Sequence, residues 1–80
     1  MERKEIDQKV KDFLVEEFEI DEAKILPEAR LREDLGIDSL DFVDIVVIVD
    51  RTFGFRIVPE ELKEVVTLRD FCDYIERKTN

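Results

Sequence analysis

The sequence predicts a small all-α fold, a four-helix bundle with three main helices, one short helix and a long loop after the first helix. Three observations favour this class. The chain has 80 residues and is 44% hydrophobic, which is enough for one modest core. Apolar residues in its longest segments recur at helical spacings. Its one strongly β-branched run has no second strand-like segment to pair with. We therefore expect a single domain over residues 1–80.

The first helix is expected over residues 3–18. Charged residues fill one face of this segment, and the other face carries an apolar stripe typical of an amphipathic helix. The stripe is spaced by four, three, one and four positions, at Ile6, Val10, Phe13, Leu14 and Phe18.

A long connection is expected over residues 19–37, with one helical turn after Asp21. It contains Pro27 and Gly36, and a loop of this length in a compact domain is usually functional. We expect four apolar residues to anchor it: Ile25, Leu31, Leu35 and Ile37.

The next segment, residues 39–53, contains the β-branched run IVVIV at 45–49, whose propensity alone favours a strand. Its surroundings favour a helix. Asp38 and Asp41 resemble an N-cap followed by an acidic first turn, and Gly54 suits the end of a helix. We expect the core-facing stripe to comprise Leu40, Val43, Val46 or Val47, and Phe53.

Two helices are expected in the last third of the chain. Residues 59–65 predict a short helix, because Pro59 suits a first helical position. Thr67 with Asp70 three residues later predicts the capped start of the final helix, which should end near Lys78 and Asn80. Its expected inner face consists of Leu68, Phe71, Cys72 and Ile75.

The composition excludes several function classes. The net charge of -9 disfavours binding to nucleic acid or to acidic membranes. The chain has no histidine and only one cysteine, Cys72, which rules out a Ser–His or Cys–His nucleophile and a His/Cys metal site. Cys72 lies on an apolar face and is expected to be an inert thiol. With no transmembrane segment and no signal peptide, we expect a cytoplasmic protein. Because the nucleophile pairs and metal ligands of common active sites are missing, we also expect that it is not an enzyme.

Ser39, the one serine in the chain, has two readings that the spacing alone leaves open. It is a cap or an exposed first-turn residue, or it is derivatised by another enzyme. A helix N-terminus suits an attached phosphate because free N–H groups and the helix dipole favour negative charge there. Asp38 and Asp41 would oppose that charge.

The segment DLGIDSLD at 34–41 resembles the attachment motif of acyl carrier proteins. The similarity extends across the chain: VDI at 43–45, FG at 53–54 and DYI at 73–75 are similar to that family's V-E-L, F-G and D-Y-I. The long loop with PEA at 27–29 and the acidic charge also match. The resemblance implies a carrier domain spanning residues 1–80.

This resemblance implies that a phosphopantetheinyl transferase attaches 4′-phosphopantetheine from coenzyme A to Ser39. The thiol of this arm, and not Cys72, would carry an acyl group as a thioester for fatty acid, polyketide or related lipid biosynthesis. Synthase, reductase and transferase enzymes with basic docking surfaces are the implied partners of a monomeric carrier. Such transient docking suits a highly charged protein.

The resemblance also implies two sets of residues. The partner-recognition set is Asp38, Leu40, Asp41, Asp44, Asp50, Glu60 and Glu61. The candidates to line an acyl pocket are Val43, Val47, Ile57, Leu62, Val65 and Phe71, for which plain core packing is the competing interpretation.

Some residues depart from the family pattern. Acids are common in the family at three positions that here hold Arg51, Thr52 and Arg56. Phe42 replaces a small polar residue beside the attachment site. It is either an exposed partner contact or a buried anchor. These differences leave room for a D-alanyl or other specialised carrier. The alternative from another class is an unmodified acidic helical adaptor that docks a basic partner.

Overall fold

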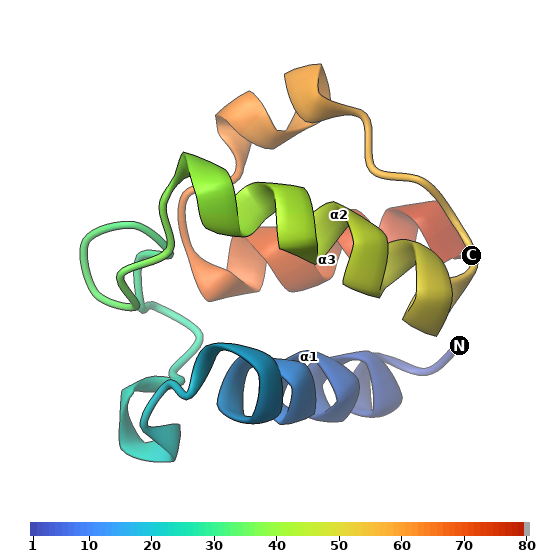
Figure 1. The fold of residues 1–80 in the computed structure, drawn as a ribbon. Coiled ribbons are helices and arrows are strands. Elements are labelled where there is room, and N and C mark those ends of the chain that lie inside the picture. Colours follow the sequence, from blue (N-terminus) through green and yellow to red (C-terminus); the bar gives the residue numbers. More distant parts are fainter. Residues whose placement is uncertain (80) are drawn as a thin grey trace.

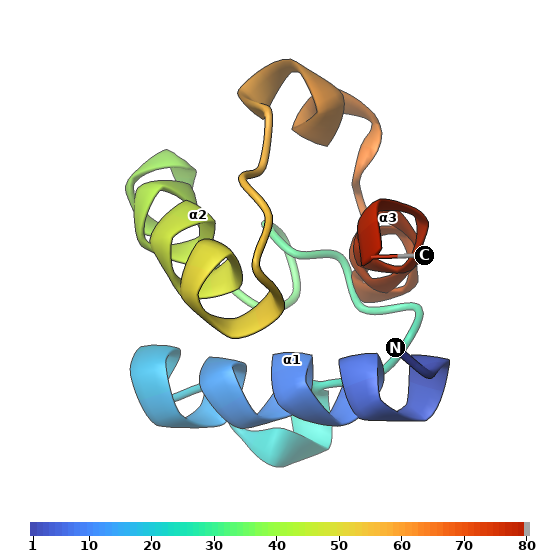
Figure 2. The same cartoon turned by 90° about the vertical axis from the view of Figure 1, so that its right-hand side faces the viewer.

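The structure is a computed structural model that describes residues 1–79. Its α-helices are α1 (Arg3–Phe18), α2 (Ser39–Phe53) and α3 (Leu68–Thr79), and its 3-10 helices are η1 (Glu22–Lys24) and η2 (Pro59–Glu64). In Figure 1, α2 lies in front of α3, both helices lie above α1, and η2 is on top. Figure 2 shows α1 crossing beneath both of its neighbours. The predicted all-α class is confirmed.

Helix α1 is held by the apolar stripe that the sequence predicts. Ile6 and Val10 are fully buried, and Phe13 and Leu14 nearly so. The helix packs on α3, where the rings of Phe13 and Phe71 meet edge to face with centroids 6.5 Å apart. The predicted boundaries, 3–18, are those observed.

Backbone hydrogen bonds hold the long connection against the start of α3. The Leu31 N–H donates to the Val66 carbonyl, and the Leu68 N–H donates to the Ala29 carbonyl, both at 2.9 Å. These bonds flank an isolated antiparallel bridge between Arg30 and Thr67. The expected helical turn follows Asp21 as η1, and the expected anchors Leu31, Leu35 and Ile37 are buried, with Ile25 half-buried.

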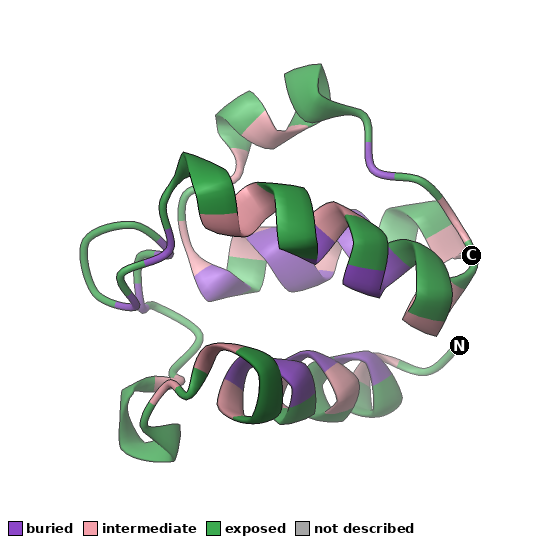
Figure 3. Ribbon diagram, in the orientation of Figure 1, coloured by how far each residue is buried: buried purple, intermediate pink, exposed green. Residues whose placement is uncertain are grey.

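Helix α2 has the predicted boundaries, but only Val46 and Phe53 of its predicted core-facing stripe pack on the core. Ile45, Ile48 and Val49 are buried, with Phe42, Val46 and Phe53 packed beside them, whereas three of the expected core residues face outward. The exposed fractions are 79% for Leu40, 63% for Val43 and 59% for Val47. Figure 3 shows the buried residues on the lower side of α2. Because this helix is apolar on two faces, its periodicity does not indicate which one packs.

The C-terminal elements follow the sequence closely. Thr67 and Asp70 form the expected reciprocal cap: the Asp70 N–H donates to Thr67 Oγ1 at 3.2 Å, and the Thr67 N–H donates to Asp70 Oδ2 at 3.1 Å. The predicted inner face of α3 is buried. The short helix is a 3-10 helix that begins at Pro59. Asn80, expected near the end of α3, lies outside the described residues.

Candidate functional site

A capping box formed by Asp38 and Asp41 holds the start of α2. The Asp38 side chain accepts hydrogen bonds from the N–H groups of Leu40 at 3.0 Å and Asp41 at 3.1 Å. The Asp41 carboxylate accepts one from the Asp38 N–H at 3.2 Å. The box satisfies amides that have no partner within the helix. The predicted N-cap at Asp38 is confirmed.

Ser39 is the first residue of α2 and is exposed. Within residues 1–79 its hydroxyl takes part in no hydrogen bond, and the side-chain cap of α2 comes from Asp38. Of the two structural roles considered for Ser39, the structure supports an exposed first-turn residue and not a cap. The helix therefore does not depend on this hydroxyl, which is open to a modifying enzyme.

The loop before Ser39 is fixed by bonds of its own. The Asp34 carboxylate accepts a hydrogen bond from the Arg30 N–H at 2.8 Å, and this bond lowers the pKa of Asp34 below its usual value. The Ile37 N–H donates to the Leu31 carbonyl at 2.9 Å. Gly36 has a φ of 71°, a left-handed conformation that suits glycine. The loop thus presents Ser39 in a defined position.

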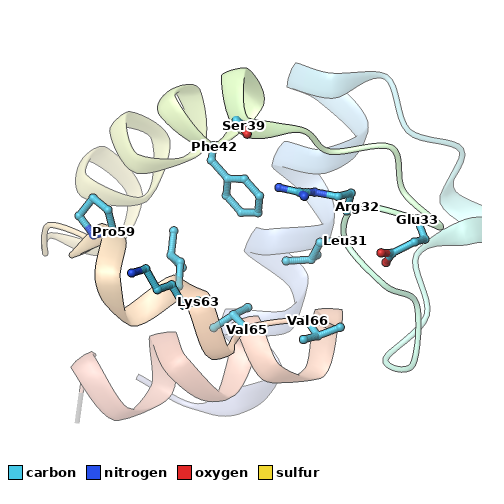
Figure 4. Close-up of a pocket in the computed structure, with 10 residues that line it drawn as sticks. Leu31, Arg32, Glu33, Ser39, Phe42, Pro59, Lys63, Val65 and Val66 are labelled. Atoms are coloured by element: carbon cyan, nitrogen blue, oxygen red, sulfur yellow. The ribbon is translucent and has the colours of Figure 1, made fainter.

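Ser39 lies at the edge of a cavity of about 460 Å³ between the loop, the first turn of α2 and η2. Figure 4 shows the Phe42 ring pointing into this cavity from α2, opposite Val65 and Val66, with Leu31 on the loop side. Phe42 is half-buried and packs on the core, which supports its interpretation as an anchor. The remaining walls combine apolar side chains with the charged residues Arg32, Glu33 and Lys63, and the exposed serine lies at one end.

The six predicted pocket residues do not form one lining. Leu62 and Val65 line the cavity beside Ser39. Ile57 and Val47 border a separate hollow near the end of α2. Phe71 is buried in the core, where it packs on Phe13. The inward placement expected for Val43 and Val47 is corrected, because both lie on the outer face of α2.

The predicted recognition residues gather on α2 and η2. Leu40 is exposed, with Asp38 before it and Asp41 and Asp44 after it. Val43 and Val47 extend the exposed apolar surface of Leu40 along the helix. We call the set of Asp38, Leu40, Asp41, Val43, Asp44 and Val47 the outer face of α2. Apolar side chains bordered by charge are typical of a protein contact surface.

Two of the other three predicted recognition acids, Asp50 and Glu61, interact with side chains of this chain. Asp50 lies 3.9 Å from the Arg56 Nε, a long and exposed ion pair. Glu61 accepts a hydrogen bond from the Tyr74 hydroxyl at 2.7 Å and pairs with Lys78 at 3.0 Å. The Tyr74 bond is the main cause of the lowered pKa of Glu61. Glu60 is exposed on η2.

Other kinds of site are not supported. Residues 1–79 contain no cluster of His, Cys, Asp and Glu that fits a metal ion. Cys72 is buried, and this burial raises its pKa to about 12, which keeps the thiol protonated. The helices of the described part lack the length and apolar character needed to cross a bilayer.

Sequence reasoning missed several residues at the cavity. Leu31 was expected only as a loop anchor, and Arg32, Lys63 and Val66 were not singled out, yet all four line the cavity with Ser39. Their proximity arises from the contact between the loop and the segment before α3. No local pattern in the sequence signals that contact.

Comparisons with known proteins match the sequence of this chain to a family. The family model described as "Phosphopantetheine attachment site" matches residues 8–75. The acyl carrier protein of Thermotoga maritima is 41% identical over 76 residues, covering 95% of this chain and 94% of that protein. The acyl carrier protein of Rubrobacter xylanophilus is 37% identical over 75 residues, with coverage of 94% and 93%. That of Coprothermobacter proteolyticus is 40% identical over 76 residues, with coverage of 95% and 93%.

Proposed function

The chain belongs to the acyl carrier protein family, and we propose that Ser39 is the residue to which its prosthetic group is attached. The protein is a carrier for fatty acid or related biosynthesis and not an enzyme, and 4′-phosphopantetheine is its covalent cofactor. The observation that carries the proposal is the exposed Ser39 hydroxyl, which is free because Asp38 caps α2.

The surroundings of Ser39 fit this group. A transferase must reach the hydroxyl, which is at the surface. The Ser39 oxygen then forms an O–P bond and loses its proton, while the pyrophosphate P–O bond of coenzyme A breaks and adenosine 3′,5′-bisphosphate leaves. The mostly apolar cavity beside Ser39 provides a surface for the arm. Because the capping box does not involve the Ser39 oxygen, α2 keeps its N-terminal hydrogen bonds after attachment.

The arm supplies the thiol on which the family carries acyl groups as thioesters. In this chain, Cys72 does not compete for that role. Its thiol is buried between α3 and α1, and at neutral pH it stays protonated and therefore weakly nucleophilic. We propose that all of the cargo is held on the arm at Ser39.

The family interacts with a phosphopantetheinyl transferase and with biosynthetic enzymes. We propose that these partners dock on the outer face of α2, with Asp50, Glu60 and Glu61 at its border. A partner surface with basic side chains around an apolar depression complements this face. We further propose that residues 1–80 act as one monomeric carrier domain in the cytoplasm.

The experiment charges the carrier in two steps. The wild type and Cys72→Ala are incubated with coenzyme A and a phosphopantetheinyl transferase, then with an acyl-acyl carrier protein synthetase and a fatty acid. Intact mass is recorded before and after hydroxylamine, which cleaves thioesters. Both proteins should gain the arm and one acyl group, and hydroxylamine should remove only the acyl group. Loss of charging in folded Cys72→Ala would contradict the proposal, and a wild type that gains nothing would favour the adaptor.

A further inference from the structure

Arg32 differs from Arg30, the other arginine of the loop before α2. Its neighbour Arg30 pairs with Asp34 at 3.4 Å and with Glu33 at 3.9 Å. Within residues 1–79, no carboxylate lies in ion-pair distance of Arg32. Figure 4 shows its side chain extending from the loop toward Phe42 and the start of α2. Arg32 and Ser39 line the same cavity.

The negative charge of a phosphodiester on Ser39 is repelled by two neighbouring carboxylates. Asp38 and Asp41 lie on either side of the attachment point and are fixed there by the capping box. The amides of Leu40 and Asp41, which a phosphate at a helix N-terminus would ordinarily use, already donate to Asp38. The phosphate therefore meets two nearby negative charges without these two donors. A cation close to Ser39 offsets that repulsion.

We propose that Arg32 binds the phosphate of the arm attached to Ser39. This inference rests on the proposed function. A guanidinium presents a planar fork of N–H donors that matches two phosphate oxygens, and Arg32 has no carboxylate partner in the described residues to give up first. Its position in the cavity directs the arm toward the apolar walls and away from the outer face of α2. Arg32 is thus a positioning residue for the prosthetic group.

The test compares four loaded proteins: the wild type, Arg32→Gln, Arg32→Lys and Lys4→Gln. Lys4→Gln removes the same charge from an exposed position in the first turn of α1, remote from Ser39. Each protein is loaded to completion with excess transferase, and intact mass confirms one arm per chain. The readouts are the phosphorus-31 chemical shift of the phosphodiester and the difference in melting temperature between loaded and unloaded forms, at low and at high salt.

Arg32→Gln should change the phosphorus shift at low salt, whereas Lys4→Gln should leave it unchanged. Loading should lower the melting temperature of Arg32→Gln by about 2 to 5 °C more than that of the wild type, and salt should reduce this difference. Arg32→Lys should restore part of both effects, because it keeps the charge but loses the fork.

Identical phosphorus shifts in loaded wild type and Arg32→Gln would overturn the assignment of Arg32. Equal effects of Arg32→Gln and Lys4→Gln would also overturn it, since they would report net charge alone. These outcomes leave the proposed function intact, because all four proteins carry the arm. Failure of the wild type to load would instead contradict attachment at Ser39.

Discussion

The two faces of α2 carry the same kind of side chain in opposite environments. On the inner face, Val49 is fully buried and Ile45 is 1% exposed. On the outer face, Val43 and Val47 are more than half exposed, as is Leu40 at the N-terminal end. Both faces are rich in β-branched residues, which are not strong helix formers. Packing against the core therefore stabilises the helix through one face only.

This difference fits separate roles for the two faces, with folding on the inner face and the proposed recognition of partners on the outer face. Exposed valines gain nothing from burial within this chain, and they have a lower helix propensity than alanine. Burial of these valines by a bound partner would offset their lower helix propensity. The acids Asp41 and Asp44 lie among them, and in the proposed docking their charge attracts the basic side chains of a partner. The inner face stabilises α2 by packing on the core, and we propose that the outer face binds the partner proteins.

The sharpest test of this comparison is a matched pair of valine substitutions. Val49→Ala removes two buried methyl groups and should lower the free energy of unfolding by about 2 kcal/mol. Val47→Ala, two positions away, should change it by less than about 0.5 kcal/mol, with a slight gain from the better helix propensity of alanine. Urea denaturation measures both, and equal losses would show that the outer face also contributes to folding.

The proposed recognition role of the outer face is tested by reversing one charge. Asp44→Lys should slow loading by a phosphopantetheinyl transferase roughly tenfold at low salt, because it weakens electrostatic steering. The effect should shrink as salt is added. Glu16→Lys makes the same charge change at an exposed position on α1. Similar slowing in both variants would indicate that net charge matters and not this face.

A smaller effect is expected at the N-terminus of α2. Asp38→Ala removes the cap from two amides and should lower the free energy of unfolding by about 1 kcal/mol. Ser39→Ala removes no hydrogen bond seen in the described chain and should stay within about 0.5 kcal/mol of the wild type. Thermal melts compare the two. An equal loss of stability in Ser39→Ala would show that the serine also caps α2.

The smallest effect concerns pH and the cap of α3. Hydrogen bonds from the backbone N–H groups of Thr67 and Val66 lower the pKa of Asp70 below its usual value of 3.8. Because the folded-state pKa is the lower one, this stabilisation is present above about pH 4 and is lost as the pH falls through the folded value. Asp70→Asn should therefore melt below the wild type at neutral pH, with the gap narrowing in acid.

The control for Asp70 is Glu28→Gln, which removes an exposed carboxylate on the long connection. It corrects for the general loss of negative charge. If the gap between Asp70→Asn and the wild type stays constant down to the acid limit of the melts, Asp70 does not contribute through its ionised form.

Much of the fold follows from local patterns in the sequence. Asp38 with Asp41, and Thr67 with Asp70, are capping pairs whose spacing alone places the starts of α2 and α3. Gly54, with a φ of 78°, terminates α2 as its position predicts. The spacing of Ile6, Val10 and Leu14 likewise identifies the buried face of α1, because charges fill its other face.

The parts that sequence reasoning missed depend on contacts between distant segments. The buried face of α2 was misjudged in part because its two apolar faces have the same period, and only packing against the core distinguishes them. The cavity beside Ser39 forms because the bridge between Arg30 and Thr67 brings the loop next to the segment after η2. Arg32 and Val66 share that cavity through this contact, which no local pattern predicts.

The most direct test of the central claim is the intact mass of the wild type and Ser39→Ala after incubation with coenzyme A and a phosphopantetheinyl transferase. The claim is that Asp38 holds the helix while Ser39 carries the arm. The wild type should gain one 4′-phosphopantetheine, and Ser39→Ala should melt like the wild type but gain no mass. A mass gain in Ser39→Ala, or none in an unmodified and folded wild type, would contradict the account.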